Sequence, residues 1–316
     1  MSVLENKRPF PNYVHLFFMD GVGLGRDEPA HNPFQQAKLP HLNALFGKEW
    51  FLAKQQPIQT DRATLVPTDA TLDMPGRPQS ATGQATILTG RNVSRLVGEH
   101  YGPKPNKAVR AVIQENNIFQ EVVRAGGHAA LLTPYPQPYF DAINSGKRLL
   151  SAVPLAATTA GVSLMTGADL AANRAVSPGF TNEAWRTHLG YTDMPQLTLA
   201  EASRQIIKLA ATYHFSFFEH WPSDRLGHRG PVEDAVRHLE MLDTVLGHLI
   251  AEWPTERGLL IITSDHGNIE DKSHRQHTTN PVPTVLVGAD HAVYAQKIHS
   301  LVDIAAIVRQ KLAIRK

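Results

Sequence analysis

Cysteine is absent from this chain of 316 residues, so disulfides, thiolate metal sites and cysteine nucleophiles are all excluded. A strong charge of one sign is absent too, because 31 lysines and arginines face 29 aspartates and glutamates, for a formal net charge of +2. No long run of lysine and arginine occurs. We therefore expect neither nucleic acid nor an anionic membrane surface as a partner.

Long hydrophobic runs are also missing. The apolar stretch within residues 1–21 is too short and too interrupted for a signal peptide or a membrane-spanning helix. We expect a soluble, cytoplasmic protein, and composition does not indicate its oligomeric state. Hydrophobic residues still make up 42% of the chain, enough for one large domain or for a core with a smaller domain.

Short apolar runs alternate with helical patterns along the chain. The clearest helical pattern covers residues 232–253, where apolar residues recur on one face. The runs that predict buried strands are 13–19, 128–133, 215–220, 258–263 and 283–288. This alternation predicts an α/β fold with a mainly parallel sheet, and such sheets carry their sites at the carboxyl ends of the strands.

Residues 103–194 break this rhythm. They contain PYPQPYF and a long tract of small residues, and proline and glycine punctuate them heavily. We expect this segment to form a small inserted cap over the edge of the sheet. Residues 1–102 and 195–316 would then form the core.

Acidic and imidazole side chains gather near the ends of the expected strands. Any one aspartate after a strand is more often a turn former or a helix cap than a ligand. Their coincidence near several strand ends favours a site for Zn, Mn or Mg, which accept carboxylate and imidazole ligands. The candidates are Asp20, Asp224, His228, Asp265, His266 and His277. The spacing of Asp224 and His228 places both on one face if their segment forms a helical turn.

Ser80 lies in PQSATGQATILTGRN, before a stretch that can form a helix. At a helix N-terminus, backbone N–H groups and the helix dipole favour an alkoxide and an approaching anion. On the local sequence alone, a simple helix N-cap is the better interpretation of this serine.

Five segments together closely resemble the metalloenzymes of the alkaline phosphatase superfamily, above all cofactor-independent phosphoglycerate mutase and phosphopentomutase. They are FMDGVG, PQSATGQATILTGR, DRLGH, SDHGN and HTTNPVP, and the resemblance covers about residues 14–91 and 215–288. It implies a three-layer alkaline phosphatase-like core and two divalent metal ions, Mn or Zn, with Mg as an alternative. It also implies that Ser80 is the nucleophile and forms a phosphoserine.

The same resemblance implies a division of the ligands between the two metals. One metal would be held by Asp20, Ser80, Asp265 and His266, and the other by Asp224, His228 and His277. The substrate would be a small anionic compound, a phosphate ester. We add Arg148, Arg174 and Lys147 as candidate contacts for it, because they lie in the expected cap.

Residues 103–194 do not resemble the second domain with which the mutase retains its intermediate. We therefore expect a metal-dependent, phosphatase-like hydrolase. A phosphomutase or phosphotransferase of the same superfamily is the main alternative, followed by a sulfate or phosphodiester hydrolase. A catalytically inactive binding protein is a further alternative. The stretch GVGLG after the first strand would fit a dinucleotide-binding oxidoreductase only weakly, since it lacks the G-x-G-x-x-G spacing.

Overall fold

The computed structural model describes residues 10–314 of the chain. A seven-stranded sheet crosses it in the order β2-β3-β9-β8-β1-β7-β4. The strands are β1 (Tyr13–Met19), β2 (Ile58–Gln59), β3 (Ala63–Thr68), β4 (Ala129–Leu131), β7 (Phe215–His220), β8 (Gly258–Ser264) and β9 (Val282–Val287). Neighbours among β8, β1, β7 and β4 are parallel, whereas β9 is antiparallel to both β8 and β3. The predicted α/β fold with a mainly parallel sheet is confirmed.

The central strand β1 is buried along its whole length. An unbroken apolar run of this kind is typical of a parallel strand that is covered on both faces. Leu16 and Phe18 pack into the core on one face of the sheet, and Phe17 and Met19 pack into the core on the other. This alternation places β1 between two hydrophobic layers.

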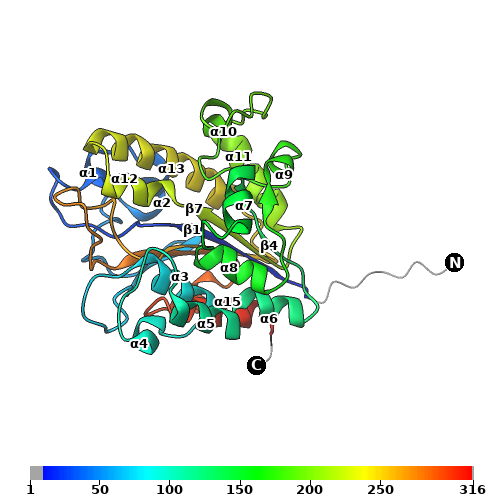
Figure 1. The fold of residues 1–316 in the computed structure, drawn as a ribbon. Coiled ribbons are helices and arrows are strands. Elements are labelled where there is room, and N and C mark those ends of the chain that lie inside the picture. Colours follow the sequence, from blue (N-terminus) through cyan, green and yellow to red (C-terminus); the bar gives the residue numbers. More distant parts are fainter. Residues whose placement is uncertain (1–9, 315–316) are drawn as a thin grey trace.

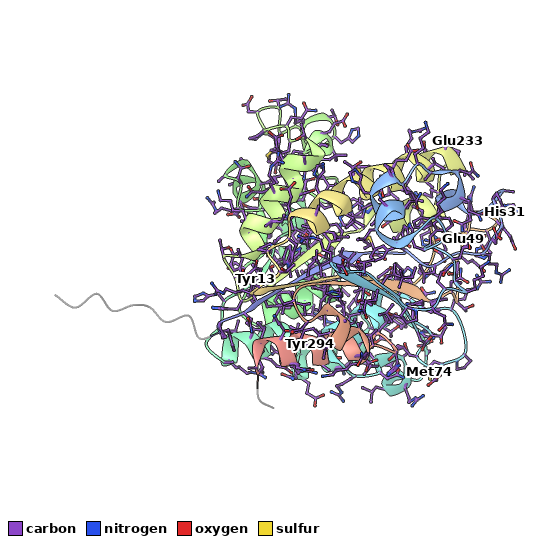
Figure 2. The ribbon with its side chains drawn as sticks, turned by 180° about the vertical axis from the view of Figure 1, so that it is seen from behind. Tyr13, His31, Glu49, Met74, Glu233 and Tyr294 are labelled. Carbon is purple, nitrogen blue, oxygen red and sulfur yellow. The ribbon has the colours of Figure 1, made fainter. Side chains whose placement is uncertain are left out.

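Helices cover both faces of the sheet, which gives three layers (Figure 1). One layer contains α3 (Ser80–Thr89), α4 (Val93–Val97), α5 (Lys107–Glu115), α6 (Ile118–Arg124), α8 (Ala152–Thr159), α14 (His291–Ala295) and α15 (Asp303–Leu312). The other contains α1 (Pro33–Gln36), α2 (Pro40–Phe46), α11 (Leu199–Ala210) and α13 (Val232–Glu252). Figure 2 shows Tyr294 of the first layer and Glu233 of the second on opposite sides of the sheet.

The division into core and cap stays a prediction, and part of residues 103–194 packs with the core of the sheet. Within this segment β4 pairs with β7 as the edge strand of the central sheet, and α5, α6 and α8 pack into the layer around α3. The long-range pairing of β4 with β7 draws its flanking helices onto the sheet, which composition could not indicate.

The remainder of the segment forms a small lobe beside α11 (Figure 1). It contains β5 (Pro134–Tyr135), α7 (Gln137–Asn144), β6 (Met165–Thr166), α9 (Gly167–Ala171) and α10 (Glu183–Thr187). Four buried residues, Leu170, Ala175, Trp185 and Met194, give it a core of its own. Across the whole described range, residues 10–314, no helix has the length and apolar character needed to cross a membrane.

Candidate metal centre

The candidate ligands meet at one edge of the sheet because of the strand directions. Asp20 follows β1 and Asp265 follows β8, so both stand at the carboxyl ends of parallel strands. α12 (Pro222–His228) follows β7 and carries Asp224 and His228 one turn apart. His277 precedes β9, and because β9 is antiparallel to β8, the start of β9 lies beside the end of β8.

Ser80 is the first residue of α3 and is buried, with 7% of its surface exposed. Its Oγ lies 3.0 Å from His266 Nε2. The same nitrogen lies 3.4 Å from Asp20 Oδ1 and 3.6 Å from Asp265 Oδ2. These contacts place the serine hydroxyl directly against a compact group of three possible ligands.

A second group surrounds Asp224. Its Oδ1 lies 3.4 Å from His228 Nε2 and 3.5 Å from His277 Nε2, and these two nitrogens are 3.1 Å apart. The rings of His277 and His266 stack with their centroids 3.7 Å apart. The two groups are therefore continuous, and all seven residues expected at the metal site lie together.

The division of ligands between two ions stays a prediction. Ligand atoms of Asp20, Asp265 and His266 lie within 4.8 Å of one another, as the expected first site requires. However, His266 also forms such a group with Asp224 and His277, so it stands between the two groups.

The positions of the protons on the rings of His228 and His277 indicate whether a cation fits between these side chains and Asp224. His228 Nδ1 lies 2.8 Å from the carbonyl oxygen of Arg275, and His277 Nδ1 lies 2.8 Å from that of Pro78. A carbonyl oxygen only accepts hydrogen bonds, so each Nδ1 carries a proton and each neutral ring turns an Nε2 lone pair toward Asp224. Two lone pairs and a carboxylate repel one another unless a cation or a proton lies between them. The donor set therefore fits a divalent cation.

The buried carboxylates of Asp20 and Asp265 give a second indication that the centre fits a cation. Asp20 Oδ1 is buried and has no hydrogen-bond partner among the described residues. Burial first, and the charge of Asp224 second, raise the pKa of Asp265 to about 7. Burial first, and Asp265 second, also raise the pKa of Asp20 well above its usual value. Carboxylates that resist ionisation in this way are stabilised in the charged form by a bound cation.

A family model described as the metalloenzyme superfamily matches residues 12–316. The chain belongs to this superfamily. A phosphoglycerate mutase of the 2,3-bisphosphoglycerate-independent type from Rhodopseudomonas palustris is 43% identical over 72 residues, covering 21% of this chain and 14% of the mutase. Its counterpart from Pseudomonas putida is 30% identical over 135 residues, covering 40% of this chain and 26% of the mutase. The chain thus matches 26% or less of these mutases.

A solved structure of a Pyrococcus horikoshii protein shares the fold. Its TM-score is 0.53 at 14% identity, and the match covers 96% of this chain and 98% of that one. The alkaline phosphatase of the Antarctic bacterium TAB5 matches with a TM-score of 0.49 at 13% identity, covering 97% of this chain and 100% of that one. The expected resemblance to metalloenzymes of this superfamily is confirmed by the family model and the mutase matches.

In this member of the superfamily, two amides that we did not predict orient the carboxylates. Gln84 donates to Asp20 Oδ2 at 3.3 Å and to Asp265 Oδ2 at 3.1 Å. Asn268 donates to Asp224 Oδ1 at 2.6 Å. The only sequence signal for Gln84 is its position four residues after Ser80, on the same face of the helix.

Two glycines allow the elements of the superfamily core to approach closely. Gly21 has a positive φ of 71°, and a Cβ there would lie 2.7 Å from Asp224 Oδ1. A Cβ on Gly83 would lie 2.9 Å from the Cβ of Asp265. Any side chain at either position would push a candidate ligand out of place.

Glu219, near the carboxyl end of β7, is a further buried acid that the sequence did not reveal as part of the site. It accepts a hydrogen bond of 2.5 Å from the Tyr135 hydroxyl. Burial raises its pKa to about 7, although this hydrogen bond acts in the opposite direction. Its charge is one of the causes, after burial, that raise the pKa of Asp20.

The candidate substrate contacts lie in different places. Arg148 stands over the ring of Tyr139, close to Tyr135 and hence to Glu219. Arg174 instead donates to Asp169 through Nε at 3.0 Å and Nη2 at 2.8 Å. It lines a different pocket, with residues at the amino end of β4, so it does not join the metal centre. Lys147 is exposed.

Proposed function

We propose that this chain is a metal-dependent phosphoryl-transfer enzyme in which Ser80 takes the phosphoryl group from a phosphate ester. The observation that supports the proposal most directly is the contact of Ser80 Oγ with His266 Nε2, at the start of a helix and amid the candidate ligands. Asp20, Asp265 and His266 would hold one divalent ion beside Ser80. Asp224, His228 and His277 would hold the other. Such ions supply Lewis-acid activation of the phosphate and of its attacking and leaving oxygens.

The protein's own residues supply position and charge. Three aspartates and an ionised Ser80 carry four negative charges, which balances two divalent cations and lets a phosphate dianion enter without net repulsion. Gln84 and Asn268 hold the carboxylates through hydrogen bonds, so the donor set is organised before the substrate arrives.

The reaction would proceed in two displacements. The bond from Ser80 Oγ to phosphorus forms while the ester P–O bond breaks, and the leaving alkoxide takes up a proton. The oxygen of an acceptor hydroxyl then attacks the phosphoserine, loses its proton and returns Ser80 to its starting form. The identity of this acceptor separates a mutase from a hydrolase.

Separate observations favour the two acceptors. The similar curated proteins are mutases, which favours transfer to a second hydroxyl of the substrate. The pocket beside Ser80, of about 330 Å³, is lined in part by the exposed residues Arg275 and Gln276, which favours access of water. We therefore keep hydrolysis and phosphomutase activity as the two forms of the proposal.

The deciding experiment follows both products in one reaction. Protein loaded with Mn or Zn is incubated with 3-phosphoglycerate, pentose 1-phosphates, simple phosphomonoesters, phosphodiesters and sulfate esters. Phosphorus NMR then follows isomerised ester and free phosphate, and an assay for inorganic sulfate follows the sulfate esters. Isomer without phosphate release supports the mutase, and stoichiometric phosphate supports the hydrolase. Absence of metal-dependent turnover of every ester would overturn the proposal in favour of a binding protein.

A further inference from the structure

The two residues Arg77 and Pro78, just before the start of α3, both bond to His277. Arg77 Nη1 donates a hydrogen bond to the backbone carbonyl oxygen of His277 at 2.7 Å. His277 Nδ1 donates to the backbone carbonyl oxygen of Pro78 at 2.8 Å. Two successive residues therefore hold both the main chain and the imidazole ring of a candidate metal ligand.

The Arg77–Pro78 dipeptide has little conformational freedom. The proline ring fixes its own φ at about −65°, and it restricts the preceding residue to extended conformations. Pro78 is buried, and Ser80 follows two residues later as the first residue of α3. The carbonyl group of Pro78 therefore has a defined position relative to Ser80, and so does the His277 ring that bonds to it.

The main chain at His277 is bonded on two sides. On one side Thr278 N donates to the carbonyl oxygen of Gly267 at 2.9 Å. On the other side the chain is exposed at residues 275–276. Among residues 10–314, the bond from Arg77 is the only hydrogen bond to the His277 carbonyl oxygen. Removing it would leave the main chain here bonded at Thr278 alone, next to an exposed loop.

The guanidinium of Arg77 has no closer partner than this carbonyl group. Arg77 lines the same pocket as Ser80. Among residues 10–314, no carboxylate oxygen lies within 4.0 Å of its side-chain nitrogens. The other contact of Nη1, with His274 Nε2, is longer, at 3.5 Å. The position of the guanidinium is therefore set mainly by the main chain of His277.

We infer that Arg77 is a positioning residue, which fixes His277 for the metal ion expected at Asp224. Because Arg77 belongs to the segment that leads to Ser80, it also sets the position of that ion relative to the nucleophile. This last step rests on the proposed function, whereas the binding of the ion does not require turnover. A ligand that is already oriented loses less entropy when it binds a metal ion, so the outer hydrogen bond strengthens binding.

Metal binding in the absence of substrate tests the inference. Calorimetry follows the binding of Mn²⁺ or Zn²⁺ to protein that has been stripped with EDTA. The parent protein is compared with Arg77→Met, which keeps an apolar side chain but removes every donor, and with Arg77→Lys. Arg275→Met is the matched control, because it removes a guanidinium from the same pocket whose nitrogens make no hydrogen bond with residues 10–314.

In Arg77→Met we expect one of the two ions to bind about 10- to 100-fold more weakly, the loss typical of removing a partner that orients a metal ligand. Arg77→Lys keeps a donor on a shorter side chain and should bind that ion with intermediate affinity. Arg275→Met should bind both ions as the parent protein does. Unchanged affinities in Arg77→Met, or an equal loss at both sites, would overturn the inference.

Nitrogen NMR of the histidine rings identifies which ion is weakened, and a general loss of stability would not give the same pattern. In a Zn²⁺ titration of Arg77→Met, the Nε2 signals of His228 and His277 should shift at higher zinc concentrations than in the parent protein. The Nε2 signal of His266 should shift at the same concentration in both. If the His277 signal shifts as early in Arg77→Met as in the parent protein, Arg77 does not position it.

These measurements separate the inference from the proposed function. If no ester is turned over but Arg77→Met still weakens one ion selectively, only the proposed function fails. If esters are turned over and Arg77→Met raises KM while both metal affinities stay unchanged, Arg77 acts on the substrate alone and only the inference fails.

Discussion

His228 and His277 face each other through Nε2 atoms that lie 3.1 Å apart, and each Nδ1 is bonded to a backbone carbonyl oxygen. Neither nitrogen of the facing pair can donate to the other while both rings are neutral. In the absence of a metal a proton must take its place, and the hydrogen bond to Asp224 accordingly raises the pKa of His228. This arrangement makes the end of the centre around Asp224 suited to holding a cation.

The first prediction concerns metal content. The chain purified without chelator should carry two divalent ions, Mn or Zn, and His277→Ala should retain only one, because Asp224 and His228 alone cannot complete a site. Elemental analysis of dialysed protein measures the ratio. His274→Ala is the control, since it changes a histidine of the same loop that lies outside the candidate ligands and should keep two ions. Two ions in His277→Ala would refute the assignment.

The second prediction concerns the nucleophile. Ser80→Ala should lower kcat roughly 10³-fold or more, since no hydroxyl remains to take the phosphoryl group. Mass spectrometry of acid-quenched protein should find one phosphoryl group on the active protein and none on the variant. Thr82→Ala is the control, because the Thr82 hydroxyl bonds to backbone atoms of Gln79 and Tyr101 and should not carry the phosphoryl group. Full activity in Ser80→Ala would move the role elsewhere.

A third prediction concerns the amide that orients two carboxylates. Gln84→Leu keeps much of the side-chain volume but removes both donors to Asp20 and Asp265, so metal affinity should fall about 10- to 100-fold. Competition against a chromophoric chelator measures the dissociation constant. Gln114→Leu, an exposed position on α5, should leave that constant unchanged. An unchanged metal affinity in Gln84→Leu would show that Asp20 and Asp265 keep their orientation without the hydrogen bonds from Gln84.

The fourth prediction is a pH dependence of stability. The pKa of Glu219 is raised from 4.5 to about 7 in the folded protein, so the folded state holds this proton more tightly than the unfolded state does. Protonation of Glu219 therefore contributes to the free energy of unfolding. This contribution is fully present below pH 4.5 and is lost as the pH rises through 7. In metal-free protein, Glu219→Gln should remove this loss, which is on the order of 3 kcal/mol.

Urea unfolding at several pH values in the presence of EDTA measures that loss. The difference in unfolding free energy between Glu219→Gln and the parent protein should grow as the pH rises. Glu256→Gln, at an exposed position, should show no such growth. A difference that stays constant with pH would mean that Glu219 ionises normally.

Much of the fold could be predicted because its central strands are buried on both faces. β1, β7, β8 and β9 each lie within two residues of the predicted ranges, and α13 ends one residue early. β3 was missed, since its sequence ATLVPT contains a proline, which is uncommon inside a strand. It is held by pairing with β9, a contact made across more than 200 residues of chain.

The residue types at the centre were determined by the sequence itself. Aspartate, histidine and serine after strands or at a helix start have only a few chemical uses, and their motifs resemble one superfamily. What the tertiary structure decided is which of them meet and what surrounds them. Gln84 and Glu219 make their hydrogen bonds to residues distant in the chain, whereas Arg174 pairs with Asp169 and lies away from the metal centre. Hydrogen bonds and electrostatic contacts act over a few ångströms in space, so sequence position alone cannot predict them.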